Sequence, residues 1–147
     1  MERDTVGRPM EILLIEDSLV SARLTMGALK NGRIEHRLTW LADGNDALEF
    51  LHQNGKYGRA PTPDLVLLDL MLPGKNGNEV LADMRSRDDL KDVPVVVMTG
   101  TAGDEPGEAL QEQVQGYLTK PIDIDKFLSI VERLKDYWKE DMILPAR

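Results

Sequence analysis

The chain has 147 residues, 41% of them hydrophobic, and its 18 Lys and Arg against 26 Asp and Glu give a formal charge of −8. This length fits one domain with a self-supporting core, and the acidic balance argues against nucleic acid as a partner, because phosphate backbones demand a basic face. The chain contains no cysteine, which excludes disulfides and thiolate chemistry. Its apolar runs are too short to span a membrane, and its charged start lacks a signal core, so we expect a cytoplasmic protein with no membrane partner.

The chain divides into three segments. Residues 1–9 are predicted to be a flexible lead-in that Gly7 and Pro9 end. Residues 10–140 are expected to form the domain, and residues 141–147 a C-terminal tail.

The first half of the domain alternates strands with helices. Residues 11–16 contain an uninterrupted apolar run, which is typical of a strand buried on both faces. Asp17 and Ser18 then open a helix, and Asp43 is a plausible N-cap for a later one. The predicted elements are strand 11–16, helix 17–31, strand 34–41 and a helix from 43 to about 54.

The second half continues the alternation. The predicted elements are strand 64–69, a helix after the turn-rich loop 72–77, strand 93–98, helix 105–114, strand 115–119 and helix 124–138. Helix 105–114 is expected to be weak because Pro106 and Gly107 lie at its start, whereas helix 124–138 is strongly amphipathic. Five strands alternating with five helices, with the central strands apolar throughout, predict an α/β fold with a parallel sheet covered on both faces.

Polar chemistry gathers at the carboxyl ends of the strands in such sheets. Five residues fall there: Glu16, Asp17, Asp69, Thr99 and Lys120. Unit charges about 4 Å apart repel by roughly 4 kcal/mol at an effective dielectric of 20, so three carboxylates should take up a proton or a cation. A hard divalent ion held by one or two carboxylates indicates Mg²⁺, although Asp17 taken alone could equally be a helix cap.

This set of groups suits phosphoryl transfer to a carboxylate. Aspartate can carry phosphate covalently. The metal and the Lys120 ammonium would neutralise the phosphoryl oxygens in the transition state. Thr99 would donate a hydrogen bond to one of them, and Gly100 would leave room for the phosphate.

Four motifs in combination resemble the receiver domain of two-component response regulators. They are Glu16-Asp17, Asp69 with Leu72-Pro73 and Gly77, Thr99-Gly100, and Tyr117-Leu118-Thr119-Lys120-Pro121. The resemblance covers about residues 10–134 and implies a flavodoxin-like fold, a doubly wound sheet of five parallel strands. It also implies that a sensor histidine kinase transfers a phosphoryl group to Asp69, and that the protein signals by a change of conformation or by dimerisation. The chain would accept phosphate without being an enzyme on other substrates.

The resemblance also implies roles for individual residues. Asp17, Asp69 and the backbone carbonyl of Met71 would ligate Mg²⁺, and Glu16 would act through a water molecule. Thr99 and Tyr117 would form a switch pair, in which Thr99 moves toward the phosphate and Tyr117 turns inward from solvent. Lys120-Pro121 would carry a cis peptide bond.

A narrower similarity points to the single-domain regulators that serve bacterial phytochromes. It rests on residues 51–63 and on the ending that includes Tyr137 and Trp138. In that subgroup the C-terminal helix and tail help to form a homodimer, so Tyr137 and Trp138 are candidate dimer contacts. They could equally close the core of their own domain.

Departures from the family pattern lead to a further expectation. Met71 and Thr101, each two residues past a site residue, are poor at holding an attacking water, which predicts slow autodephosphorylation. Gln115 stands where the family often has a small residue before Gly116.

Three other classes are weighed against the phosphoaccepting regulator. A degenerate receiver that only binds partners would not need the complete set of site residues. A flavin or nucleotide carrier would need a Gly-rich phosphate loop after the first strand, where this chain has the acidic Glu16-Asp17. A hydrolase with an aspartyl nucleophile would need a general acid two residues past Asp69, where this chain has Met71.

Overall fold

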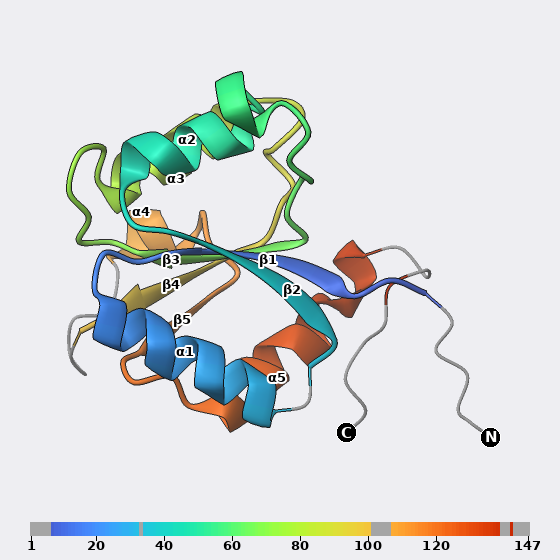
Figure 1. Ribbon diagram of the computed structural model, residues 1–147. Helices are drawn as coiled ribbons and strands as arrows, with labels where there is room; N and C mark the ends of the chain where they lie inside the picture. Colours follow the sequence, from blue (N-terminus) through green and yellow to red (C-terminus); the bar gives the residue numbers. More distant parts are fainter. Residues whose placement is uncertain (1–6, 33, 101–106, 139–141, 143–147) are drawn as a thin grey trace.

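The structure is a computed structural model that describes residues 7–32, 34–100, 107–138 and 142. These residues form a five-stranded parallel sheet with the strand order β2-β1-β3-β4-β5 and helices on both faces (Figure 1). This arrangement confirms the predicted flavodoxin-like α/β fold, in which the strand order reverses between β1 and β3.

The elements follow the predicted order with shifted ends. The strands are β1 Met10–Ile15, β2 His36–Leu41, β3 Leu65–Asp69, β4 Val95–Thr99 and β5 Gly116–Thr119. The helices are α1 Leu19–Asn31, α2 Gly44–Leu51, α3 Gly77–Ser86, α4 Glu108–Gln111 and α5 Ile124–Leu134. Two single 3-10 turns, η1 Gly55–Tyr57 and η2 Lys135–Tyr137, follow α2 and α5.

The core lies in two layers, one on each face of the sheet. Side chains alternate along a strand, so Ile12 and Leu14 face α1 and α5 while Leu13 and Ile15 face α2 and α3. Figure 1 shows the same division, with α1 and α5 below the sheet and the other three helices above it. Burial of β1, β3 and β4 on both faces explains their uninterrupted apolar sequences.

Polar caps start the helices a few residues after the strands end. The Ser18 hydroxyl accepts a hydrogen bond from the Ser21 N–H at 3.2 Å and begins α1. Asn76 and Glu79 form a reciprocal capping box at the start of α3, with both bonds at 2.9 Å. The loop between β1 and α1 is short, residues 16–18, whereas the loop between β3 and α3 extends over residues 70–76 at the same edge of the sheet.

Three expectations about the helices need correction or qualification. The α-helix predicted to reach Trp138 ends at Leu134, because η2 tightens the chain there. The weak helix predicted over 105–114 is only the single turn α4, although residues 105 and 106 lie outside the described part. In α1, the helical spacing of Leu19, Met26 and Leu29 predicts that they share the buried face, but Leu19 is 48% exposed, and Leu29 is buried together with Ala22 and Thr25.

The two ends of the domain contact each other more than the predicted segments suggest. Arg8, in the predicted lead-in, forms an isolated parallel bridge with Met142 of the predicted tail. Met142 is 5% exposed and belongs to the core layer under α1 and α5. The boundaries at residues 9 and 141 remain predictions.

Candidate functional site

The carboxyl ends of four strands bring the predicted residues together. Glu16 and Asp17 follow β1, Asp69 ends β3, Thr99 ends β4 and Lys120 follows β5. The register aligns these ends, because Asp69 lies beside Met98 and Thr99 lies beside Thr119. Residues as far apart in the sequence as Glu16 and Lys120 thus share one edge of the sheet.

Lys120 joins the two buried carboxylates of this edge. Its Nζ lies 2.7 Å from Glu16 Oε1 and 2.8 Å from Asp69 Oδ2. Burial alone would lower the pKa of Lys120, but the close contacts with the carboxylates of Asp69 and Glu16 outweigh it and raise that pKa above its ordinary value. The ammonium is therefore fixed as a cation against Asp69.

Glu16 is buried and only partly compensated. Its residue exposure is 0%, and its Oε2 accepts a hydrogen bond from the Ser18 N–H at 3.0 Å. Oε1 is within ion-pair distance of Lys120 but makes no hydrogen bond of good geometry. Desolvation raises the pKa of this carboxyl above its ordinary value, although the contacts with Lys120 and Ser18 oppose the shift.

The three carboxylates have the chemistry of a divalent-cation site. One oxygen each from Glu16, Asp17 and Asp69 lies within 4.8 Å of the others. Asp17 is exposed, whereas Glu16 and Asp69 are buried, so the cluster opens to solvent on one side. Hard oxygen donors around a concentration of negative charge, with one poorly satisfied buried oxygen, fit Mg²⁺ or a similar ion.

A cavity of about 300 Å³ lies directly against Asp69. Its walls are the side chains and backbone of β3, β4 and the loops after them: Asp69, Leu70, Met71, Met98, Thr99 and Gly100. The Met71 N–H donates a 2.9 Å hydrogen bond to Asp69 Oδ1, which orients the carboxylate. The Thr99 hydroxyl donates only a long 3.5 Å bond to the Leu118 carbonyl, so it is weakly held beside this cavity.

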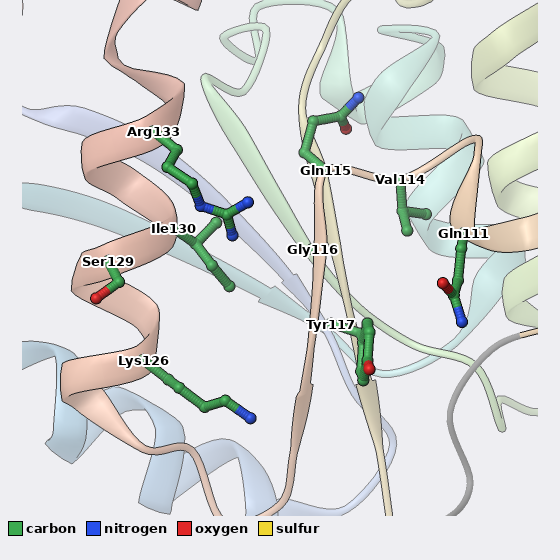
Figure 2. A pocket seen from close by; sticks show the side chains of 9 residues that line it. All are labelled: Gln111, Val114, Gln115, Gly116, Tyr117, Lys126, Ser129, Ile130 and Arg133. Carbon is green, nitrogen blue, oxygen red and sulfur yellow. The ribbon is translucent and has the colours of Figure 1, made fainter.

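Tyr117 lies on β5, away from the carboxylate cluster. It is partly buried and lines a separate pocket of about 400 Å³ between α4 and α5. Figure 2 shows Lys126 and Arg133 reaching from α5 on one side of Gly116, with Tyr117 and Gln111 on the other. The predicted Lys120-Pro121 cis peptide is present directly after this strand.

The two dimer candidates lie at the opposite edge of the sheet and differ in environment. Trp138 packs against the core of its own domain, and its indole Nε1 donates a 2.8 Å hydrogen bond to the Asp64 carbonyl. Tyr137 is 53% exposed. Of the two, only Tyr137 offers most of its side chain to another molecule.

Sequence reasoning missed two residues that support the strand ends. The Trp40 indole Nε1 donates a 2.6 Å hydrogen bond to the Glu16 carbonyl. Gln115 Oε1 accepts bonds from the Val95 N–H at 2.7 Å and from Arg85 Nη2 at 3.1 Å, which fastens the beginnings of β4 and β5 together. The alternation of the strand through Leu38 and Trp40 marks Trp40 as an inward-facing residue, but it does not say which acceptor the partly buried indole N–H finds.

Comparison with known proteins decides the family. The chain matches the response regulator receiver domain family over residues 12–132. It belongs to this family. The receiver domain is a phosphoacceptor regulatory domain of two-component signalling, and the acidic pocket at Glu16, Asp17 and Asp69 is typical of a phosphoacceptor site.

The similar proteins include response regulators, among them a phytochrome response regulator. Response regulator Rcp1 from Synechocystis sp. is 42% identical over 144 residues, which cover 97% of this chain and 98% of Rcp1. The Mn²⁺-bound crystal structure of Rcp1 has a TM-score of 0.71 and covers 94% of this chain and 100% of that one. The phosphorylated cyanobacterial phytochrome response regulator RcpA is 37% identical, with a TM-score of 0.70 over 94% of this chain and 99% of that one.

A bacteriophytochrome response regulator shows the same similarity. The bacteriophytochrome response regulator RtBRR is 30% identical, with a TM-score of 0.79 over 94% of this chain and 84% of that one. The predicted resemblance to phytochrome-associated receiver domains is thus confirmed. Within the described ranges, no helix of this receiver domain is long and apolar enough to cross a membrane, and its location in the cytoplasm stays a prediction.

Proposed function

We propose that a sensor histidine kinase transfers a phosphoryl group to Asp69 of this receiver domain, with Mg²⁺ bound beside it. The observation that carries the proposal is the contact of Lys120 Nζ with Asp69 Oδ2 at 2.8 Å, in a cluster that also includes the carboxylates of Glu16 and Asp17. An acidic residue that is 4% exposed, oriented by a backbone N–H and paired with a lysine beside a cavity is poised to react.

The transfer forms a bond between an Asp69 carboxylate oxygen and phosphorus. The bond between phosphorus and the donor imidazole nitrogen breaks, and the imidazole keeps the electron pair and takes a proton from water. Lys120 stays protonated and stabilises the negative charge on the phosphoryl oxygens. Thr99 can give up its long hydrogen bond to the Leu118 carbonyl and donate a hydrogen bond to one of those oxygens instead.

Asp17, Asp69 and the Met71 carbonyl are the proposed Mg²⁺ ligands, with Glu16 acting through water. The carboxylate cluster supports the first two assignments, and the position of Met71 on the cavity wall supports the third. Mg²⁺, when bound, would neutralise charge that develops on the phosphoryl group. The Mn²⁺-bound form of Rcp1 supports a divalent metal at this site.

Thr99 and Tyr117 are the proposed switch pair. Movement of the Thr99 hydroxyl toward phosphate would free space on the β4–β5 side of the domain, into which Tyr117 could turn. Since Tyr117 lines the pocket between α4 and α5, this turn would alter the surface shown in Figure 2. A few kcal/mol of differential affinity is enough to shift two such states.

The proposed kinase is associated with a phytochrome-like sensor. The support is the similarity to Rcp1, RcpA and RtBRR, two of which are named as phytochrome or bacteriophytochrome response regulators. We also propose that the protein can form a homodimer through Tyr137, because Trp138 is engaged within its own domain. Loss of dimer in light scattering for Tyr137→Ala would support this contact, and an unchanged mass would contradict it.

Acetyl phosphate provides a direct test of the acceptor. Wild-type protein incubated with acetyl phosphate and Mg²⁺ should gain the mass of one phosphoryl group, while Asp69→Asn should gain none. Excess EDTA should abolish the gain in the wild type. The matched control is Asp88→Asn, whose side chain is 100% exposed, and which should be modified like the wild type. Modification of Asp69→Asn at the wild-type rate would refute the proposal.

Slow loss of the phosphoryl group belongs to the same proposal. Met71 is 80% exposed and carries no polar atom on its side chain that could orient a water for attack on phosphorus. Thr101, the other residue that supports this expectation, lies outside the described part of the chain. A lifetime of seconds, measured by intact mass after removal of acetyl phosphate, would contradict slow autodephosphorylation.

A further inference from the structure

The segment that joins β2 to α2 contacts the loops after β1 and β3, which flank the carboxylates of the site, without contributing a residue to the site. We define this segment, residues 40–44, as the β2–α2 brace. At one end it touches the loop after β1, which carries Glu16 and Asp17, and at the other it touches the loop after β3, which carries Met71. Figure 1 shows β2 leading into α2 at the edge of the sheet beside β1.

The first contact holds the backbone of Glu16 from two sides. Trp40 Nε1 donates a 2.6 Å hydrogen bond to the Glu16 carbonyl, and the Glu16 N–H donates a 3.0 Å bond to the Leu41 carbonyl. The indole itself is partly buried against the core layer of α1 and α5, so its ring position is set by packing. The direction in which the Glu16 and Asp17 side chains leave the backbone therefore depends on Trp40.

The second contact is a close approach of two backbones. The Gly44 N–H donates a 3.3 Å bond to the Pro73 carbonyl in the loop after β3. A Cβ added to Gly44 would lie 1.7 Å from the Lys75 carbonyl oxygen, which no real structure allows. Only glycine lets α2 begin against this loop, and the same loop supplies the Met71 N–H that orients Asp69.

We propose that the β2–α2 brace sets the spacing of the loops after β1 and β3 and thereby sets the affinity of the site for Mg²⁺. Trp40 and Gly44 are positioning residues in this proposal, which rests on the proposed function of the site. Groups that orient metal ligands from outside commonly change metal affinity tenfold or more when they are altered. The carboxylates respond to small displacements because their mutual repulsion and their attraction to a cation both vary steeply with distance.

The structure supplies a matched control for each position. Trp138 also donates its indole N–H to a backbone carbonyl, that of Asp64 at 2.8 Å, but at the opposite edge of the sheet. Gly27 lies in α1 with nothing within 4 Å of an added Cβ. Trp138→Phe and Gly27→Ala thus repeat the chemical changes of Trp40→Phe and Gly44→Ala away from the brace.

The test is calorimetric titration of Mg²⁺ into each folded variant, with thermal unfolding measured in EDTA. Trp40→Phe should weaken Mg²⁺ binding about threefold to tenfold, as expected for loss of one hydrogen bond that orients a ligand. Gly44→Ala should weaken it roughly tenfold or more, because the loop after β3 must move. Both control variants should bind Mg²⁺ like the wild type, even where their melting temperatures fall.

The optical signal gives an independent readout. In Trp138→Phe, Trp40 is the remaining tryptophan, and its emission should change on Mg²⁺ addition with the same Kd that calorimetry reports. The brace is refuted if folded Trp40→Phe keeps the wild-type Kd, or if Trp138→Phe weakens binding as much. If the wild type itself binds no Mg²⁺, the proposed metal site is refuted, and the proposal about the β2–α2 brace falls with it. If Gly44→Ala does not fold, the result for Trp40→Phe decides alone.

Discussion

Glu16 is a carboxylate that the fold keeps out of water, and this has a measurable pH signature. Burial raises its pKa above the ordinary value of 4.5. A group whose pKa is raised by folding contributes stability below its unfolded pKa and loses it as the pH rises through the folded pKa. Without metal, wild-type protein should therefore lose stability relative to Glu16→Gln as the pH rises above about 4.5 toward neutrality.

Chemical denaturation in EDTA across pH 4 to 8 checks this expectation. The quantity to plot is the difference in free energy of unfolding between wild type and Glu16→Gln. Glu49→Gln, at an exposed position on α2, serves as the control, and its free energy of unfolding should differ from that of the wild type by the same amount at every pH. A difference for Glu16→Gln that is flat, or that favours the wild type with rising pH, would show that Lys120 fully compensates the buried charge.

Lys120 should stabilise the metal-free protein and weaken the binding of Mg²⁺. Lys120→Gln leaves Glu16 and Asp69 buried without their cation, so the metal-free protein should lose about 2 to 4 kcal/mol of stability. The same change removes a positive charge from the cluster, so Mg²⁺ should bind more tightly. Phosphorylation by acetyl phosphate should nevertheless slow, since the charge on the phosphoryl oxygens loses a stabilising partner.

Urea unfolding, calorimetry and intact mass measure these three effects separately. Lys126→Gln, which removes a lysine from the pocket between α4 and α5, should change stability by less than about 0.5 kcal/mol and leave Mg²⁺ binding unaltered. Weaker Mg²⁺ binding by Lys120→Gln would mean that the lysine organises the carboxylates more than it competes for them.

The residues of the site could be predicted from the sequence because strand ends are easy to locate. Asp69 and Thr99 follow apolar runs with no break, so their positions at the edge of the sheet were fixed by counting. The supporting contacts of Trp40 and Gly44 could not be predicted. They depend on how closely two loops approach in space, and neither side-chain period nor residue type records that distance.

At the scale of elements, the side chain of Gln115, just before β5, supplies the hydrogen-bond acceptor for a backbone N–H at the start of β4. Gln115 Oε1 accepts the Val95 N–H and is held by Arg85, whose guanidinium also donates to the Lys91, Val93 and Gln113 carbonyls. Gln115→Ala would leave the Val95 N–H without this partner and should cost about 1 to 3 kcal/mol.

Thermal or urea unfolding measures the stability of Gln115→Ala and of a control variant, Gln113→Ala. Gln113→Ala removes only a 3.3 Å exposed bond to Ala109 and should stay within about 0.5 kcal/mol of wild type. Equal stability of the two variants would mean that water replaces the Gln115 amide without penalty. The departure from the family pattern at residue 115 would then have no structural consequence at the start of β5.

Helix ends were less predictable than helix positions. Capping residues identified the starts of α1 and α2, since Ser18 and Asp43 both accept the expected backbone N–H. The end of α5 was missed because residues 135–137 keep a helical hydrogen-bonding direction with the tighter 3-10 spacing. The buried face of α1 was also missed in part, because Leu19 stays exposed while Thr25 is buried.

In the whole molecule, the acidic site and the contacts that hold the two ends of the chain lie at opposite edges of the sheet. The carboxyl ends of the strands carry the acidic site. The amino ends carry a clamp centred on Asp64, which receives Arg8 through two bonds of 2.7 and 2.9 Å and the Glu11 N–H at 2.8 Å. The Asp64 carbonyl also accepts the Trp138 indole, so this residue ties both ends of the described chain to β3.

This separation predicts that stability and metal binding respond to different carboxylates. The Asp64 side chain is only 12% exposed and accepts hydrogen bonds from the Arg8 guanidinium and the Glu11 N–H. Asp64→Ala removes this acceptor, so it should cost about 2 to 4 kcal/mol of stability. Mg²⁺ affinity and phosphorylation of the folded variant should match the wild type, because the clamp lies at the far edge of the sheet. Asp69→Asn should show the reverse, with phosphorylation abolished and the fold retained.

Urea unfolding in EDTA, followed by Mg²⁺ titration well below the unfolding midpoint, distinguishes the two variants. A Mg²⁺ affinity that falls with Asp64→Ala would mean that the clamp and the site form one coupled unit, in which closure of the termini is transmitted along β3 to Asp69.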